Sequence, residues 1–221
     1  MVGFLSKSSC LAVLGVVLFW LAFASAGDLR AEQTRRDLAA GAPLSSAAAG
    51  ALGYVPRPEA VWSTGEAFDF AAALELSINE DTAGRFAQAE QYSIQALKRA
   101  PSNPLYWFRL AAARYGGGDQ VGAIEALEAS FMWGGVLDDA SLARSRLSDL
   151  LWTNLSEDMR RAARRELRLM VRDRGLLIDL ANAYEVFSPP FRREIIASAE
   201  PSDRAFLIRR IRRNAADRDR S

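Results

Sequence analysis

The sequence predicts an all-α fold, and three observations lead to this prediction. From Glu66 onward, apolar residues recur at the three- and four-residue spacings of amphipathic helices. The middle of the chain repeats with a period of 34 residues, a length typical of paired helices. No segment of useful length alternates apolar and polar residues as a half-buried strand does. With 221 residues, half of them hydrophobic, the chain can build an ordinary core.

Composition excludes several classes of function. The chain has no histidine and a single cysteine, Cys10, which rules out Ser-His-Asp and Cys-His catalysis and zinc sites that use histidine or several cysteines. The formal charge of +1 argues against a strongly basic nucleic-acid-binding module. We therefore expect no catalytic residue, no cofactor and no metal site.

The first 26 residues have the order of a secretory signal. Lys7 precedes an uncharged run over 10–24, and Ala24-Ser25-Ala26 supplies the small residues that a signal peptidase requires. The alternative is an uncleaved anchor, although a span needs about 20 apolar residues and Leu5–Ala26 reaches that only by including Lys7 and three serines. Both alternatives place the body outside the cytoplasm. The predicted location is periplasmic, either soluble or anchored to the inner membrane.

Residues 27–66 are predicted to be a linker. Ala, Gly, Ser and Pro dominate from Ala39 to Gly65, and three prolines interrupt any long helix there. Only Arg30–Ala42 has the character of a short helix. From residue 67 to 213 we expect one helical domain, followed by a charged tail over 214–221.

The repeat is visible as residue pairs 34 positions apart. Identical pairs are Leu76 and Leu110, Gly84 and Gly118, and Ala89 and Ala123; small residues pair as Ser77 with Ala111 and Ala96 with Ser130. Small residues at these positions let helices cross closely, and a proline at the end of one helix stops it before the next.

These residues resemble the tetratricopeptide repeat family over about residues 70–135, or two units. The best stretch runs from Gly84 to Pro101. The start of the next unit is then matched by Trp107, Leu110 and Ala111, and its turn and second helix by Gly118-Asp119 and Ala123. The chain departs from the family at Ala73, where Trp is usual, and at Gly135, where a closing Pro is missing. The resemblance implies a short α-solenoid of antiparallel helix pairs. Two units rarely suffice alone, so the C-terminal helices are expected to cap it.

The C-terminal half is predicted to be helical without a clear repeat. The expected helices are Ser141–Trp152, a helix capped by Ser156 and ending at Arg172, Leu176–Phe187, and short helices over 191–199 and 203–213. Gly175 is expected to stop one helix, and Ser188-Pro189-Pro190 to separate two others. The capping surface should be apolar and should cover Leu127 and Phe131; its residues are Leu167, Met170, Val171, Leu177, Leu180 and Ala181.

The resemblance also implies a concave binding surface made by the first helix of each unit. On that helix Phe108, Arg109 and Tyr115 are the predicted contacts, since an arginine between aromatic rings can hold a carboxylate or a peptide backbone. The predicted function is a non-enzymatic scaffold that binds a protein or peptide in the cell envelope. The resemblance also suggests an association with polysaccharide export or cell-wall assembly.

Three other patterns have competing interpretations. Gly116-Gly-Gly-Asp119 suits a phosphate loop or, better, a turn between helices, because no strand precedes it. The acid pairs Glu80-Asp81 and Asp138-Asp139 are either helix caps or the carboxylates of a carbohydrate-active or lytic enzyme, which is the alternative function. The tryptophans at 107, 133 and 152 either line a sugar-binding surface or pack internally, and the position of Trp107 favours packing.

The last helix is rich in arginine. From Ser188 the chain has nine Arg and five acids, and apolar residues at 206, 207, 208 and 211 are interleaved with Arg204, Arg209, Arg210, Arg212 and Arg213. Such a helix either docks on anionic lipid or packs its apolar side on a neighbouring helix. The sequence favours the second interpretation, with the charged side in solvent.

Overall fold

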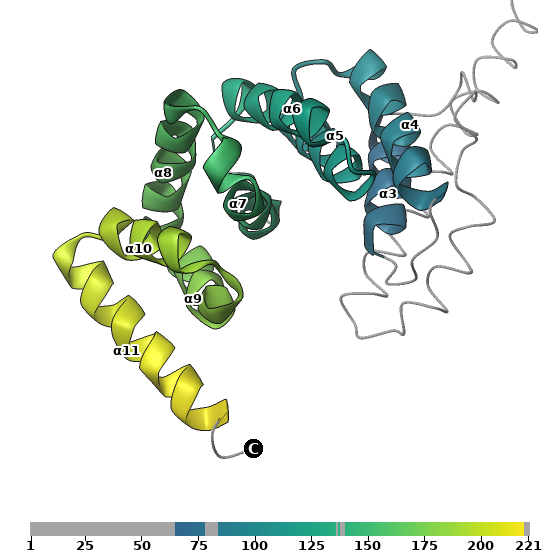
Figure 1. Ribbon diagram of the computed structural model, residues 1–221. Helices are drawn as coiled ribbons and strands as arrows, with labels where there is room; N and C mark the ends of the chain where they lie inside the picture. The colour runs from purple at the N-terminus through teal and green to yellow at the C-terminus, as the bar shows by residue number, and fades with distance from the viewer. Residues whose placement is uncertain (1–64, 78–83, 136, 138–139, 219–221) are drawn as a thin grey trace, which may run out of the picture. The chain divides into compact units, whose positions relative to one another are not determined.

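The computed structural model describes residues 65–77, 84–135, 137 and 140–218, and this part of the chain is all-α, as predicted (Figure 1). It contains nine α-helices and two short 3-10 helices within those ranges. The chain divides into two compact units, Met1–Pro101 and Ser102–Ser221. The predicted signal or anchor over 1–26 and most of the predicted linker lie outside the described residues.

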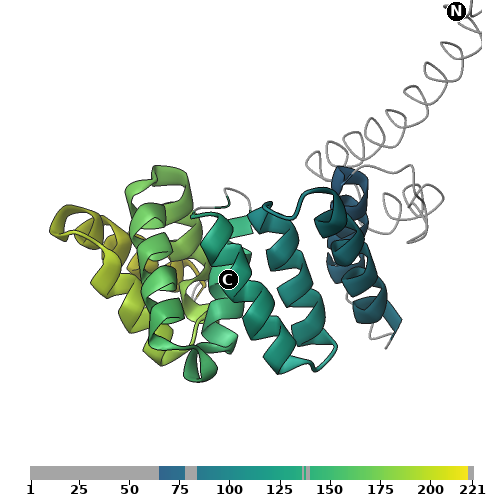
Figure 2. The same cartoon turned by 90° about the horizontal axis from the view of Figure 1, so that it is seen from above.

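In the described part of the first unit, α3 (Gly65–Ser77) and α4 (Gly84–Arg99) form an antiparallel pair and lie side by side in Figures 1 and 2. Phe68 of α3 is fully buried, with its ring centroid 6.3 Å from that of Tyr92. The guanidinium carbon of Arg99 lies 4.4 Å from the centre of the Phe68 ring. Ala72 and Ala89 have no exposed surface, so the helices of this pair approach through small side chains.

The second unit begins with a further antiparallel pair, α5 (Pro104–Gly116) and α6 (Gln120–Trp133). Asn103 caps α5 by accepting the backbone N–H of Leu105 at 2.9 Å, and Pro104 occupies the first turn, where its missing N–H costs nothing. Gly118 between the helices has φ of 86°, a left-handed conformation that favours glycine. Asp119 then caps α6 by accepting the Gly122 N–H at 2.9 Å. The glycine run is therefore a turn between helices.

The burial pattern of α4 recurs in α6 34 residues later. Four residues of α4 and the four residues of α6 that follow them by 34 positions are all at most 4% exposed. The pairs are Ala89 and Ala123, Tyr92 and Ala126, Ser93 and Leu127, and Ala96 and Ser130. The sequence period therefore corresponds to equivalent buried faces on the second helices of the two pairs.

Four of the remaining helices begin close to the predicted positions. They are α7 (Ser141–Leu150), α8 (Glu157–Arg172), α10 (Pro189–Ser198) and α11 (Pro201–Arg218). Ser156 caps α8 through its Oγ, which accepts the Met159 N–H at 3.2 Å, as the sequence predicts. Ser188 caps α10 in the same way, with Pro189 in its first turn.

Two predicted boundaries are wrong. Gly175 does not stop a helix; it lies inside α9 (Arg174–Ala183), because Asp173 caps that helix by accepting the Leu176 N–H at 3.0 Å. The chain also does not leave helical structure at Asn214. The helix α11 continues to Arg218, and the Asn214 side chain donates to the Ala181 carbonyl at 3.2 Å, which holds this part of α11 on α9.

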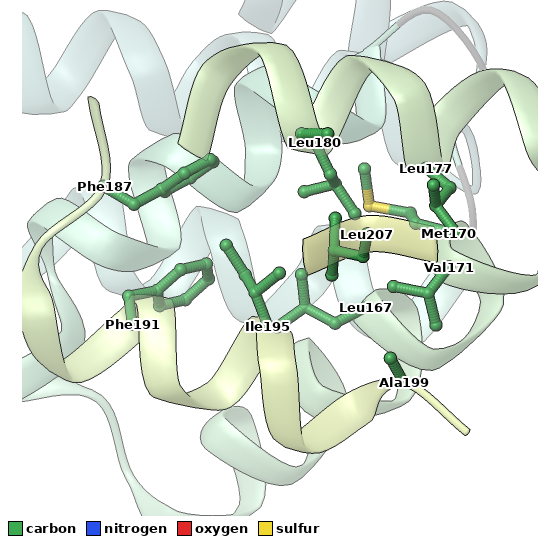
Figure 3. Close-up of a cluster of buried hydrophobic side chains, with 11 residues drawn as sticks. Leu167, Met170, Val171, Leu177, Leu180, Phe187, Phe191, Ile195, Ala199 and Leu207 are labelled. Atoms are coloured by element: carbon green, nitrogen blue, oxygen red, sulfur yellow. The ribbon is translucent and has the colours of Figure 1, made fainter. Parts of the chain in front are cut away.

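The C-terminal helices share one hydrophobic core (Figure 3). All six residues predicted as the capping surface are at most 2% exposed and belong to this core. Phe187 and Phe191 stack with ring centroids 5.3 Å apart at one end, and Leu207 of α11 is fully buried among its neighbours. Helix α8 contacts α6 as well as α7, α9 and α10, so it links this core to the α5–α6 pair.

Among the residues that the structure describes, no helix combines the length and the apolar character needed to cross a bilayer.

Candidate functional site

The three predicted partner-binding residues lie on α5 and differ in exposure. Phe108 is only 3% exposed, whereas Arg109 and Tyr115 are half-buried. The guanidinium carbon of Arg109 lies 5.8 Å from the centre of the Phe108 ring, within the range of a cation–π contact. Tyr115 follows Phe108 by about two helical turns on the same side of α5. Arg109 and Tyr115 therefore offer side-chain surface, and Phe108 supports Arg109 from within.

Two apolar side chains are exposed at the C-terminal end of α6. Met132 is 74% exposed and Trp133 is 53% exposed, so Trp133 is not part of the core. The chain then passes close to α5: a Cβ at Gly134 would lie 2.6 Å from Cγ of Pro104, which only glycine avoids. We call Met132 and Trp133 the α6-end surface. Exposed aromatic and methionine side chains are enriched at protein interfaces.

Trp107 and Trp152 are both half-buried. The Trp152 ring meets Phe191 edge-on with centroids 5.1 Å apart and packs against the C-terminal core. Of the three tryptophans considered for a sugar-binding surface, Trp133 is thus the most exposed.

The most extensive polar arrangement in the second unit centres on Arg144 of α7, which is fully buried. Its Nε and Nη2 atoms donate to the Glu166 carboxylate of α8 at 2.6–3.0 Å. Its Nη1 donates to the Ser130 hydroxyl at 3.1 Å and to the Gly134 carbonyl at 3.3 Å. The guanidinium also lies 4.6 Å from the centre of the Phe131 ring. One side chain therefore joins α6, α7 and α8.

Burial changes the pKa of the carboxyl group that pairs with Arg144. Glu166 is 2% exposed, and burial raises the pKa of its carboxyl because the ionised form loses its hydration. The charge of Arg144 and the hydrogen bonds from Arg144 and Ser141 oppose this rise in pKa. Because the pair lacks solvent access and its donors are used internally, we assign it to structure rather than to ligand binding.

A second buried carboxylate joins α7 to α10. Asp149 is 6% exposed and accepts the Ser188 backbone N–H at 2.9 Å, the Ser188 hydroxyl, and Nη1 of Arg146 at 2.7 Å. Since Ser188 is the N-cap of α10, Asp149 fixes where that helix starts.

Helical spacing alone does not identify Arg144, Glu166 or Asp149 as buried polar residues. A usable signal was present for one of them: Glu166 lies between Ala163 and Leu167 on the apolar side of α8, where a charge requires a buried partner. Nothing in the sequence identifies Arg144 as that partner, because the contact spans separate helices.

The acid pairs of the alternative enzymatic interpretation, Glu80-Asp81 and Asp138-Asp139, lie outside the described residues. Comparison of the chain with models of protein families, with curated proteins and with solved structures gave no match.

Proposed function

We propose that this chain is a non-enzymatic scaffold of tetratricopeptide-like helix pairs that binds a protein or peptide partner in the cell envelope. The observation that carries the proposal is the recurrence of buried positions between α4 and α6 at the 34-residue period. Repeats of this length pack through one face of each unit and use another for binding. In this proposal, α8 and the helices after it cap the open end of a short solenoid.

The distribution of polar groups in the second unit favours binding over catalysis. Its buried charged groups, Arg144, Glu166 and Asp149, hold helices to one another. The polar and aromatic groups with accessible surface on α5 include Arg109 and Tyr115. Arginine and tyrosine are enriched among residues that dominate binding energy at protein interfaces.

The cellular setting of the proposal comes from the sequence alone. The order of charge, apolar run and small residues over 1–26 favours export, and export places the partner in the envelope. A role in polysaccharide export or cell-wall assembly is part of the same proposal and depends on identifying that partner.

The test is photo-crosslinking in envelope preparations of the native host, followed by variants at the same surface. A crosslinkable residue at Tyr115 should capture a partner, and Arg109→Ala with Tyr115→Ala should reduce capture at least several-fold. Phe108→Ala is made separately, because Phe108 is buried and its loss also affects folding.

The matched control is Arg165→Ala with Arg168→Ala, two exposed residues of α8. If the Arg109→Ala, Tyr115→Ala variant and the control are both folded and capture the partner equally well, α5 is not the binding surface. Turnover of labelled peptidoglycan or glycan by the pure protein would instead favour the enzymatic alternative.

A further inference from the structure

Helix α11 carries an outward-facing row of arginines that the proposed scaffold function does not use. Over Pro201–Arg218 there are six Arg and two Asp, in a chain whose overall formal charge is only +1. With a side-chain balance of +4 (six Arg minus two Asp), α11 is more positive than the chain as a whole, so it produces a local positive field.

One side of α11 is already occupied by packing. Leu207 is fully buried, and Phe206 and Ile211 pack against the same core. Arg174 of α9 stacks on Phe206, with its guanidinium carbon 3.3 Å from the ring centre. Asn214 donates to Asn182 Oδ1 at 3.0 Å. Contacts near both ends therefore fix which side of α11 faces outward.

The opposite side presents Arg209, Arg212 and Arg213. At 3.6 residues per turn these side chains point away from Leu207, and all three are exposed. Within the described residues none of them forms an ion pair. The other exposed residues on this side of α11 are small: Ser202, Ala205 and Ala216. We call this set of three arginines the α11 basic face.

We propose that the α11 basic face docks on an anionic lipid bilayer by electrostatic contact, without insertion. Insertion of an amphipathic helix requires its apolar side, which in α11 is used against α9. Within the described residues, α11 exposes no large apolar side chain of the kind that forms the centre of a protein interface. Fixed positive charges suffice for a surface of anionic headgroups.

The N-terminal sequence supports this choice of occupant. The apolar run Leu5–Ala26 is predicted to be a signal or an anchor, and both bring the chain to a membrane. A basic patch adds to any apolar attachment, because each Lys or Arg near an anionic surface is attracted to it independently. The α11 basic face would supply this added attraction if the segment is retained, and the main attraction if it is removed.

The experiment compares binding of the full chain to vesicles of phosphatidylcholine with binding to mixed phosphatidylcholine–phosphatidylglycerol vesicles. The apolar N-terminus contributes to binding of both kinds of vesicle, so the ratio of the two affinities isolates the effect of lipid charge. The variant is Arg209→Gln, Arg212→Gln and Arg213→Gln. Each arginine should contribute about fivefold, so the variant should lower the ratio on the order of 100-fold. Raising the salt from about 0.1 to about 1 M should act similarly on the wild type, since the screening length falls from about 10 to about 3 Å.

The matched control removes the same charge elsewhere, as Arg165→Gln, Arg168→Gln and Arg193→Gln, all at exposed positions. It should change the ratio far less. Equal losses in variant and control, or no preference for anionic vesicles in the wild type, would overturn the proposal. A third outcome would also overturn the proposal: the wild type binds an acidic peptide, the variant does not, and neither prefers anionic vesicles. The α11 basic face would then be assigned to a protein partner. Capture through α5 should be unchanged in the α11 variant, so this test fails or succeeds separately from that of the scaffold.

Discussion

Arg144 shows how a single side chain can specify the arrangement of several helices. A buried guanidinium is tolerated only when its donors are satisfied, and here Glu166, Ser130 and the Gly134 carbonyl satisfy them. Any arrangement of α6, α7 and α8 that separates these groups leaves a charge buried without a partner. The pair therefore contributes to the uniqueness of this packing as well as to its stability.

This arrangement predicts a strong coupling between Arg144 and Glu166. Arg144→Met or Glu166→Gln alone should lower the free energy of unfolding by about 3–5 kcal/mol, because each leaves the remaining partner buried without its full complement. The double variant should lose far less than the sum. Urea denaturation followed by circular dichroism measures all three values, and losses that simply add would show that the two side chains do not act as a unit.

At the residue scale, the sequence predicted the buried apolar positions better than the buried polar ones. Leu167, Met170 and Leu180 were identified because helical spacing places them on one side. Arg144 and Asp149 were not identified, because their burial depends on contacts with other helices. Phe108 was predicted to contact a partner, but it is buried. Helical spacing shows on which side of α5 Phe108 lies, and it does not show which other residues cover that side.

At the scale of the helix, boundaries were predictable where a capping side chain is local. Ser156 starts a helix as expected, since the cap requires only the next three residues. Ser188, expected only to separate two helices, caps α10 through the same local contact. Gly175 was misjudged because the cap of Asp173 begins a new helix before the glycine. Helix α11 extends beyond its predicted end because Asn214 bonds to α9, which is tertiary information.

The start of α10 provides a prediction about capping. Ser188→Ala removes the acceptor for the Phe191 N–H and the hydroxyl that donates to Asp149, so the free energy of unfolding should fall by about 0.5–2 kcal/mol. Ser202→Ala, at an exposed position of α11, should leave it nearly unchanged. Thermal unfolding followed by circular dichroism gives both values. An equal effect of the two substitutions would exclude Ser188 as a significant cap.

At the scale of the whole molecule, the chain joins two helix pairs of similar pattern to a C-terminal set of helices with its own core. The second pair and that core lie within one compact unit, linked by α8. This arrangement fits the interpretation of the C-terminal helices as a cap. Within that unit, the second pair is in contact with helices that do not repeat its pattern.

Truncation after Trp152 tests this interpretation. It removes α8 to α11 and with them Glu166, so Arg144 loses its carboxylate partner and Leu142 and Trp152 lose the apolar core against which they pack. Exposing one large apolar side chain costs about 1.5–3 kcal/mol, and a domain has only about 5–15 kcal/mol of stability in total. The truncated protein should therefore aggregate or lack a cooperative thermal transition. If it melts cooperatively near the temperature of the full chain, the helices after Ser156 form a separate domain, and the prediction of one domain over 67–213 is wrong.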